Sequence, residues 1–169
     1  MGVVVAIQHL QGYALFGGVS DEQMIRLARL LRQEHFAEGA FLFNQGDPAD
    51  RLFFIQQGQV EILSRLSDDT QVRLSLRQEG DSIGEMAMID LQPRSASVRA
   101  LEPVTVLSIK YLDLSALYGE DPPLFTLILM NLARELSRRL RDMDEVVASS
   151  LFATGVRAEC GFHRAELER

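Results

Sequence analysis

Tryptophan is absent from the 169 residues, and cysteine occurs only once, at Cys160. A single thiol excludes an internal disulfide, a CxxC redox pair and a cysteine-held iron–sulfur cluster. Histidine is also scarce, and His9, His35 and His163 lie too far apart to suggest a metal or haem site. Neither a basic leader nor a long uninterrupted apolar run is present, so we expect a cytoplasmic protein that does not enter a membrane.

Positive charge is in short supply. Lysine and arginine total 17 against 24 aspartates and glutamates, which gives a formal net charge of -7. DNA-binding modules need a basic surface that neutralises phosphates, so we expect no direct DNA binding by this chain. We also find no nucleophile–base pair or group of metal ligands, and therefore expect no enzyme activity. A hydrophobic content of 47% is ordinary for a globular domain.

Two patterns predict the secondary structure of the first 110 residues. Ser20-Asp-Glu-Gln23 forms a capping box, and the helical spacing that follows predicts a helix over 21–33. Over 35–110 the apolar residues alternate, and glycines separate the runs. This pattern is typical of short antiparallel strands. We therefore expect a mainly β fold with flanking helices, built on an antiparallel, jelly-roll-like β-roll.

A long C-terminal helix is predicted over 122–148, because Asp121 is a good cap and proline suits the first turn. Its apolar residues recur in steps of three and four: Leu129, Leu132, Leu136, Leu140, Met143 and Val147. Such a stripe either packs on the helix's own domain or forms the seam of a homodimer, and its length favours the homodimer. Residues 1–149 then make up one domain, and 150–169 a linker or tail.

The segment from Gly80 to Val98 holds the candidate functional residues. Gly84 precedes a short predicted helix, and Glu85 can accept hydrogen bonds from a hydroxyl group. The planar fork of Arg94 can hold two phosphate oxygens, and Ser95 adds a hydroxyl donor. A carboxylate and a cationic fork together suit a sugar phosphate. The alternative is that Glu85 and Arg94 merely pair with each other in a surface turn.

The same segment resembles the phosphate-binding cassette of the cyclic-nucleotide-binding domain family, which includes catabolite activator proteins and protein kinase A regulatory subunits. The matching motifs are Gly84-Glu85-Met86-Ala87 and Arg94-Ser95-Ala96. With the strand–glycine–strand frame before them, the resemblance covers about Leu15 to Val147. It implies that Glu85 holds the ribose 2′-hydroxyl, that Arg94 holds the cyclic phosphate, and that the other cassette residues complete the cradle.

The base is less well defined by the resemblance, which places the long helix over it. The candidate base contacts are Val72, Leu74, Arg139, Met143 and Asp144. A carboxylate at Asp144 can accept from the amino group of adenine, or twice from the edge of guanine; its alternative is a solvated helix face. We favour cyclic AMP as the ligand, with cyclic GMP left open and no metal or haem expected.

The resemblance implies a cyclic-nucleotide sensor that signals by moving its C-terminal helix, most simply to an effector protein whose identity the sequence does not give. The alternative is the sensory part of a transcription regulator of the catabolite-activator type that lacks its helix-turn-helix domain, because the residues after the long helix show no basic recognition helix. A third reading is a degenerate domain kept only for dimerisation, and the presence of both Glu85 and Arg94 argues against it.

Overall fold

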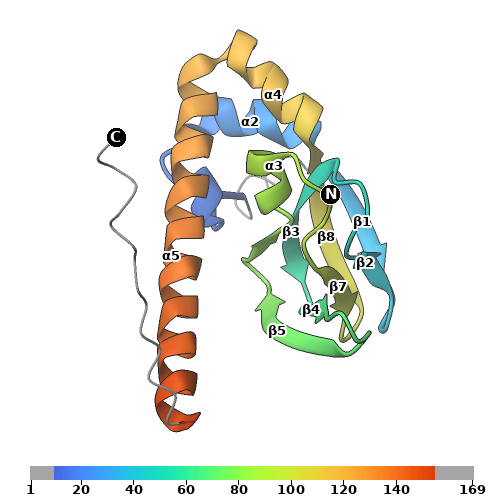
Figure 1. Cartoon of the computed structure of the whole chain (residues 1–169). Coiled ribbons are helices and arrows are strands. Elements are labelled where there is room, and N and C mark those ends of the chain that lie inside the picture. The colour runs from blue at the N-terminus through green and yellow to red at the C-terminus, as the bar shows by residue number, and fades with distance from the viewer. Residues whose placement is uncertain (1–9, 155–169) are drawn as a thin grey trace, which may run out of the picture. The chain divides into compact units, whose positions relative to one another are not determined.

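A computed structural model describes residues 10–154, except for the side chains of 87, 88 and 154. The chain divides into two units, Met1–Leu132 and Ala133–Arg169, and each is described by itself. The elements in chain order are η1 (Ala14–Phe16), α2 (Asp21–Leu30), β1 (Arg32–Phe36), β2 (Phe41–Phe43), β3 (Arg51–Gln57), β4 (Gln59–Arg65), β5 (Gln71–Gln78), β6 (Ser82–Ile83), α3 (Met86–Asp90), β7 (Ser97–Ala100), β8 (Val104–Lys110), α4 (Tyr111–Glu120) and α5 (Pro122–Thr154) (Figure 1).

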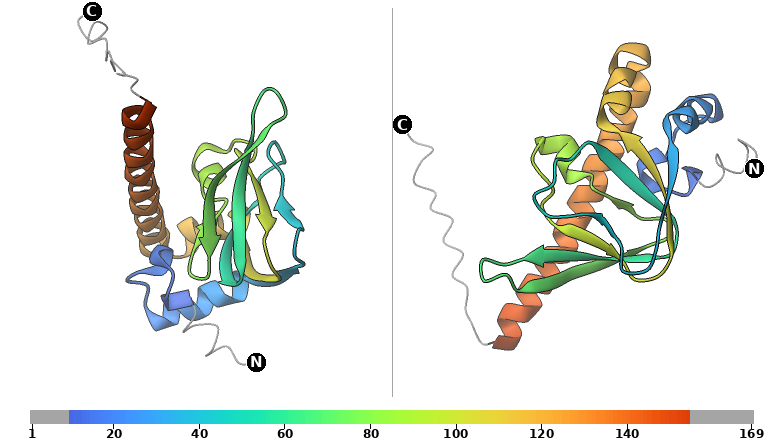
Figure 2. Two further views of the ribbon diagram at one scale, coloured as in Figure 1. Left: turned by 90° about the horizontal axis from the view of Figure 1, so that it is seen from below. Right: turned by 90° about the vertical axis from the view of Figure 1, so that its right-hand side faces the viewer.

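The strands form two four-stranded antiparallel sheets, ordered β1-β8-β3-β6 and β2-β7-β4-β5. Figure 2 shows the two sheets from two further sides. The predicted fold class, an antiparallel β-roll followed by a long C-terminal helix, is confirmed.

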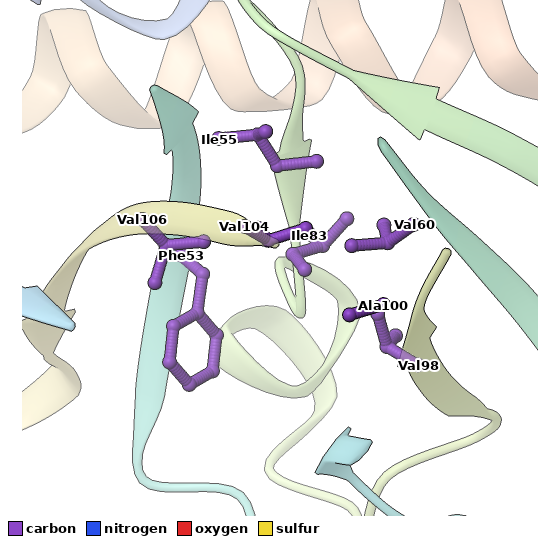
Figure 3. Packing of buried hydrophobic residues seen from close by; sticks show 8 residues of the cluster. All are labelled: Phe53, Ile55, Val60, Ile83, Val98, Ala100, Val104 and Val106. Carbon is purple, nitrogen blue, oxygen red and sulfur yellow. The ribbon is translucent and has the colours of Figure 1, made fainter. Parts of the chain in front are cut away.

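The core of the roll lies between the two sheets, where alternate residues of five strands meet. Figure 3 shows the eight buried side chains, which are Phe53, Ile55, Val60, Ile83, Val98, Ala100, Val104 and Val106. Successive side chains of a strand point to opposite faces, so the other residues of β3 and β8 face away from this core. Among them Phe54 is fully buried, with its ring 5.2 Å from Tyr13 and 4.9 Å from Phe16. The central strand β3 is therefore covered on both faces.

The bounds of the helices differ from the sequence-based expectations. Helix α2 begins at Asp21 with the predicted capping box, in which the Gln23 backbone N–H donates to Ser20 Oγ at 3.3 Å. It ends at Leu30 rather than at residue 33, because Leu31 is extended and β1 then pairs with β8. The roll accordingly begins at Arg32 instead of residue 35. Pairing across the sheet outweighs the local helical pattern there.

Helix α5 continues to Thr154, six residues beyond the predicted end at 148. Ser150 stays inside the helix, where its hydroxyl donates to the carbonyl of Val146 at 2.8 Å. Residues 155–169, most of the predicted tail, lie outside the described part of the chain. The domain boundary at 149/150 stays a prediction.

Asp121 joins α4 to α5. Its backbone N–H donates to the Leu117 carbonyl at 2.8 Å, and its side chain accepts from the Leu124 N–H at 3.1 Å, which caps the first turn of α5. Gln23 and Arg26 of α2 also reach this carboxylate, at 3.2 and 2.9 Å. The Leu124 N–H, then Gln23, then the charge of Arg26 lower the pKa of Asp121 below its ordinary value of 3.8.

We predict that the unfolding free energy of Asp121→Asn falls less in acid than that of the wild type. A carboxyl whose pKa is lowered by folding stabilises the fold above its unfolded pKa, and this contribution is lost as the pH falls through the folded pKa. The difference in unfolding free energy between wild type and Asp121→Asn, measured by urea denaturation, should therefore be larger at pH 7 than at about pH 3. Asp113→Asn is the control, because the Asp113 carboxylate has no partner among the described residues. An equal difference at both pH values would contradict the assignment.

Candidate functional site

The segment singled out in the sequence crosses from one sheet to the other. It leaves the first sheet at the end of β6, turns at Gly84, forms the five-residue helix α3 and enters the second sheet at Ser97. Gly84 has φ +83°, and a Cβ built there would lie 2.4 Å from Arg94 Nη1. Only glycine fits this position without displacing the guanidinium.

Arg94 is buried between the two sheets, with 5% of its surface exposed. Its Nη1 donates to the Gly84 carbonyl at 3.2 Å and to the Tyr111 hydroxyl at 3.3 Å, and its Nη2 donates to the Arg51 carbonyl at 2.7 Å. The Phe43 ring faces the guanidinium, with its centroid 4.1 Å from Cζ. Three acceptors and an aromatic face thus hold this cation inside the protein.

One nitrogen of Arg94 has no such contact. Its Nε is buried and has no hydrogen-bond partner among the described residues. Leaving a buried donor unsatisfied costs about 1–3 kcal/mol. A bound anion would remove this cost, so the unpaired Nε is the kind of defect that marks a ligand site.

Glu85 directly precedes α3 and, like Arg94, is 5% exposed. The charges of both residues act on the hydroxyl of Tyr111. Burial raises the pKa of Tyr111 most strongly, Arg94 lowers it, and Glu85 and Asp50 raise it further. Both side chains are buried, so the alternative of an exposed ion pair in a surface turn is wrong.

The remaining cassette residues surround this cluster. Ser95 is exposed and its Oγ lies 3.7 Å from Met86 Sδ, while Ala96 is buried. The backbone of Arg94 is fixed by two hydrogen bonds to the turn after β2: its N–H donates to Asp47 O at 2.9 Å, and its carbonyl accepts from Gly46 at 2.8 Å. The side chain of Ala87 lies outside the described part.

The candidate base contacts fall in two places. Val72 and Leu74 lie on β5 and are exposed. Arg139, Met143 and Asp144 lie on α5 within the second unit, where Arg139 Nε donates to Glu135 at 3.1 Å and the other two are exposed. Their contact with a base stays a prediction.

Sequence reasoning missed three neighbours of Arg94. Tyr111 lies 17 residues away at the start of α4, Phe43 ends β2, and Arg51 contributes only a backbone carbonyl. No local motif signals any of them; only the pairing of strands brings them together. Within residues 10–154 no cluster of three metal-ligating side chains occurs, and no helix has the length and apolarity needed to cross a bilayer.

Comparison with known proteins identifies residues 33–121 as a match to the model of the cyclic nucleotide-binding domain family. A CRP-like cAMP-activated global transcriptional regulator of Mycobacterium tuberculosis is 28% identical over 79% of this chain and 59% of its own length. A cGMP-dependent protein kinase, isozyme 1, of Drosophila melanogaster is 31% identical over 58% of this chain and 13% of its own. A solved cyclic nucleotide-binding domain from Methylobacillus flagellatus is 27% identical, with a TM-score of 0.77 over 87% of this chain and 83% of that one.

These matches agree with the geometry of the site. The matched region runs from β1 to the end of α4 and so includes Glu85, Arg94 and Tyr111. The chain spans 59% of the length of the bacterial regulator and 13% of that of the kinase. The activities of those whole proteins therefore do not follow from the alignment.

We predict that Gly84→Ala destabilises the protein more than Gly80→Ala does. Both glycines have positive φ, +83° and +90°, but a Cβ at Gly80 meets nothing within 4 Å. The left-handed backbone alone should cost about 1–2 kcal/mol at either position. At Gly84 the added methyl also displaces a buried, hydrogen-bonded cation, which adds roughly 1–3 kcal/mol. Urea denaturation measures the difference, and equal losses would show that Arg94 is not held against Gly84.

Proposed function

This chain belongs to the cyclic nucleotide-binding domain family, and we propose that it is a sensor that binds cyclic AMP between the cassette and the β-roll. The observation that carries the proposal is the buried guanidinium of Arg94, whose Nε has no partner among the described residues, with the buried carboxylate of Glu85 at the start of α3 in the same cassette. A cyclic nucleotide carries one negative charge on its phosphate and a free ribose hydroxyl, the two groups that a guanidinium and a carboxylate recognise.

Arg94 supplies the phosphate contact. Charge-assisted hydrogen bonds from arginine to phosphate are about twice as strong as neutral ones and are often bidentate. Their strength rises further where water is excluded, as it is around a residue that is 5% exposed. Glu85, at the start of α3, accepts a hydrogen bond from the ribose 2′-hydroxyl. Met86, Ala87, Ser95 and Ala96 complete the wall of the cradle.

We propose that the helix α3 moves when the ligand enters, because Arg94 is buried. Two residues with left-handed backbone flank this helix: Gly84 at φ +83° and Leu91 at φ +54°. Leu91 is strained there, at a cost of about 1–2 kcal/mol. These are the positions where a small change in backbone dihedral angles would swing α3 with the least loss of packing.

The choice of base rests on the second half of α5. In this proposal Asp144 accepts from the exocyclic amine of adenine, and the other candidate base contacts are Arg139 and Met143 of α5 and Val72 and Leu74 of β5. The same carboxylate accepts two hydrogen bonds from guanine, and one relative, the Drosophila kinase, is named for cyclic GMP. Cyclic GMP is therefore the second candidate ligand.

The signal leaves the domain through α5. A nucleotide that touches both the cassette and this helix favours the arrangement in which the two are close, and shifts the population by its difference in affinity for the two arrangements. In this proposal an effector protein receives the signal. The alternative is that the signal controls DNA binding by a further domain of a transcription regulator, which the similarity to the Mycobacterium regulator favours. We assign no catalytic role to the chain itself and place it in the cytoplasm.

We predict that Arg94→Lys weakens cyclic AMP binding by about 100-fold, because it keeps the charge but loses the fork. Isothermal titration calorimetry with cyclic AMP, cyclic GMP and adenosine measures this effect. Glu85→Gln should weaken both cyclic nucleotides by about tenfold. Arg77→Lys is the control, since among the described residues Arg77 of β5 donates only to the neighbouring carbonyl of Leu76. Absence of heat with both cyclic nucleotides in the wild type would refute the sensor function. Tighter binding of cyclic GMP than of cyclic AMP would make cyclic GMP the assigned ligand.

A homodimer through α5 follows from its apolar stripe. Leu140, Met143 and Val147 recur at steps of three and four and are exposed by 62%, 58% and 53%. The helix is 33 residues long, and only its residues up to Leu132 belong to the first unit. A second copy of the same helix would bury this stripe as a coiled-coil seam.

We predict that Leu140→Glu combined with Met143→Glu converts a dimer into a monomer, because charges in a coiled-coil seam are desolvated without partners. Sedimentation equilibrium measures the mass. Ser149→Glu is the matched control, since it adds charge to the same helix about 180° around the axis from Leu140. A wild-type protein that sediments as a monomer at micromolar concentration would rule out the dimer.

A further inference from the structure

The three acceptors that hold Arg94 come from neighbouring strand ends of a single sheet. In the order β8-β3-β6, strand β3 begins at Arg51, β8 ends one residue before Tyr111, and β6 ends one residue before Gly84. The register pairs Arg51 with Lys110 and Phe53 with Ile83. The antiparallel pairing therefore places a carbonyl, a phenol and a second carbonyl at the same end of this sheet, where they meet Arg94 of the connection between α3 and β7.

Tyr111 is the one side chain among these acceptors. Its hydroxyl donates to the Gly84 carbonyl and accepts from Arg94 Nη1 at 3.3 Å. Its backbone N–H donates to the Asp50 carbonyl at 2.9 Å, which ties it to the residue before Arg51. Tyr111 is also the first residue of α4. One residue thus connects the glycine of the cassette, the cation and the helix that leads to α5.

The hydrogen bonds of Arg94 leave one edge of its guanidinium available. Arginine has five N–H groups. Nη1 donates to the Gly84 carbonyl and the Tyr111 hydroxyl, and Nη2 donates to the Arg51 carbonyl. The Nε–H is buried and has no partner in the described part of the chain. Nε and Nη2 form one edge of the planar group, and two parallel N–H groups on one edge are the fork that binds a phosphate.

We propose that Tyr111 is a positioning residue for phosphate recognition: with the Gly84 carbonyl it fixes Nη1, and so presents the Nε–Nη2 edge of Arg94 to the phosphate. The proposal rests on the cyclic-nucleotide-binding function. Without the phenol, Nη1 keeps only the Gly84 carbonyl, and the guanidinium can rotate in the plane that faces Phe43. Arg94 would then distinguish less strongly between the two exocyclic oxygens of the phosphate.

The test uses two sulfur-substituted forms of the cyclic nucleotide that wild type binds more tightly. In one, sulfur replaces the axial exocyclic oxygen, and in the other the equatorial one. A guanidinium fixed in one orientation distinguishes the two, because sulfur accepts hydrogen bonds poorly. Titration calorimetry on wild type and Tyr111→Phe gives the ratio of their affinities. We expect Tyr111→Phe to weaken the binding of the unsubstituted nucleotide and to change this ratio by about fivefold, the loss of one hydrogen bond.

Two conservative variants serve as controls. Tyr118→Phe removes an exposed hydroxyl from the same helix α4. Tyr13→Phe removes a buried hydroxyl that donates to the Ile55 carbonyl at 2.8 Å and not to a neighbour of Arg94. Both should leave the ratio unchanged, and Tyr13→Phe should do so even where it lowers stability. If a general loosening of the fold were the cause, the ratio of affinities would change in Tyr13→Phe and in Tyr111→Phe alike.

The outcomes separate the two proposals. Wild type that binds no cyclic nucleotide overturns the sensor function and this inference with it. Wild type that binds, together with a ratio unchanged in Tyr111→Phe, overturns the positioning role alone. If Tyr111→Phe does not fold, a measurement on wild type still tests the proposal. In a protein labelled with ¹⁵N-arginine, the Arg94 Nε–H resonance, assigned with Arg94→Lys, should shift downfield when the nucleotide is added. An unshifted Nε–H under saturating nucleotide would refute the use of this edge.

Discussion

The burial of one guanidinium between two sheets is the constraint on which the site depends. An isolated charge inside a protein is costly unless it is paired and hydrogen-bonded. Arg94 meets this requirement with two carbonyls, a phenol and the face of Phe43. Each of these contacts ties a different segment to the cation: the turn at Gly84, the start of β3, the start of α4 and the end of β2. A substitution of Arg94 therefore removes contacts with both sheets and with Tyr111, the first residue of α4.

Strand register, rather than the cassette itself, sets this arrangement. The positions of the Arg51 carbonyl and of Tyr111 follow from the pairing of β3 with β8, and that of Gly84 from the pairing of β3 with β6. The hydrophobic alternation of these strands fixes their register, because a slip by one residue would turn Phe53 and Val106 out of the core. The core shown in Figure 3 thus determines where the acceptors of Arg94 lie.

Local patterns in the sequence are sufficient for what is local in the structure. The Ser20–Gln23 capping box, the short helix after Gly84 and the cap at Asp121 are all found where they were predicted. The end of α2 was misplaced because β1 gains its hydrogen bonds from β8, about 70 residues later, which a helical pattern cannot reveal. Tyr111 was missed for the same reason: its partners lie 17 and 27 residues earlier and meet it only through the sheet.

The unpaired Nε has a consequence for selectivity. Its cost of about 1–3 kcal/mol raises the free energy of the ligand-free protein, and only a ligand that accepts from Nε recovers it. A nucleoside has the same base and ribose but offers no acceptor there, so it must enter the buried site without this gain. The corresponding factor is roughly 5 to 150 in affinity, in addition to the charge attraction itself. The unpaired Nε therefore favours a cyclic nucleotide over a nucleoside. This preference does not depend on any contact between the long helix and the base.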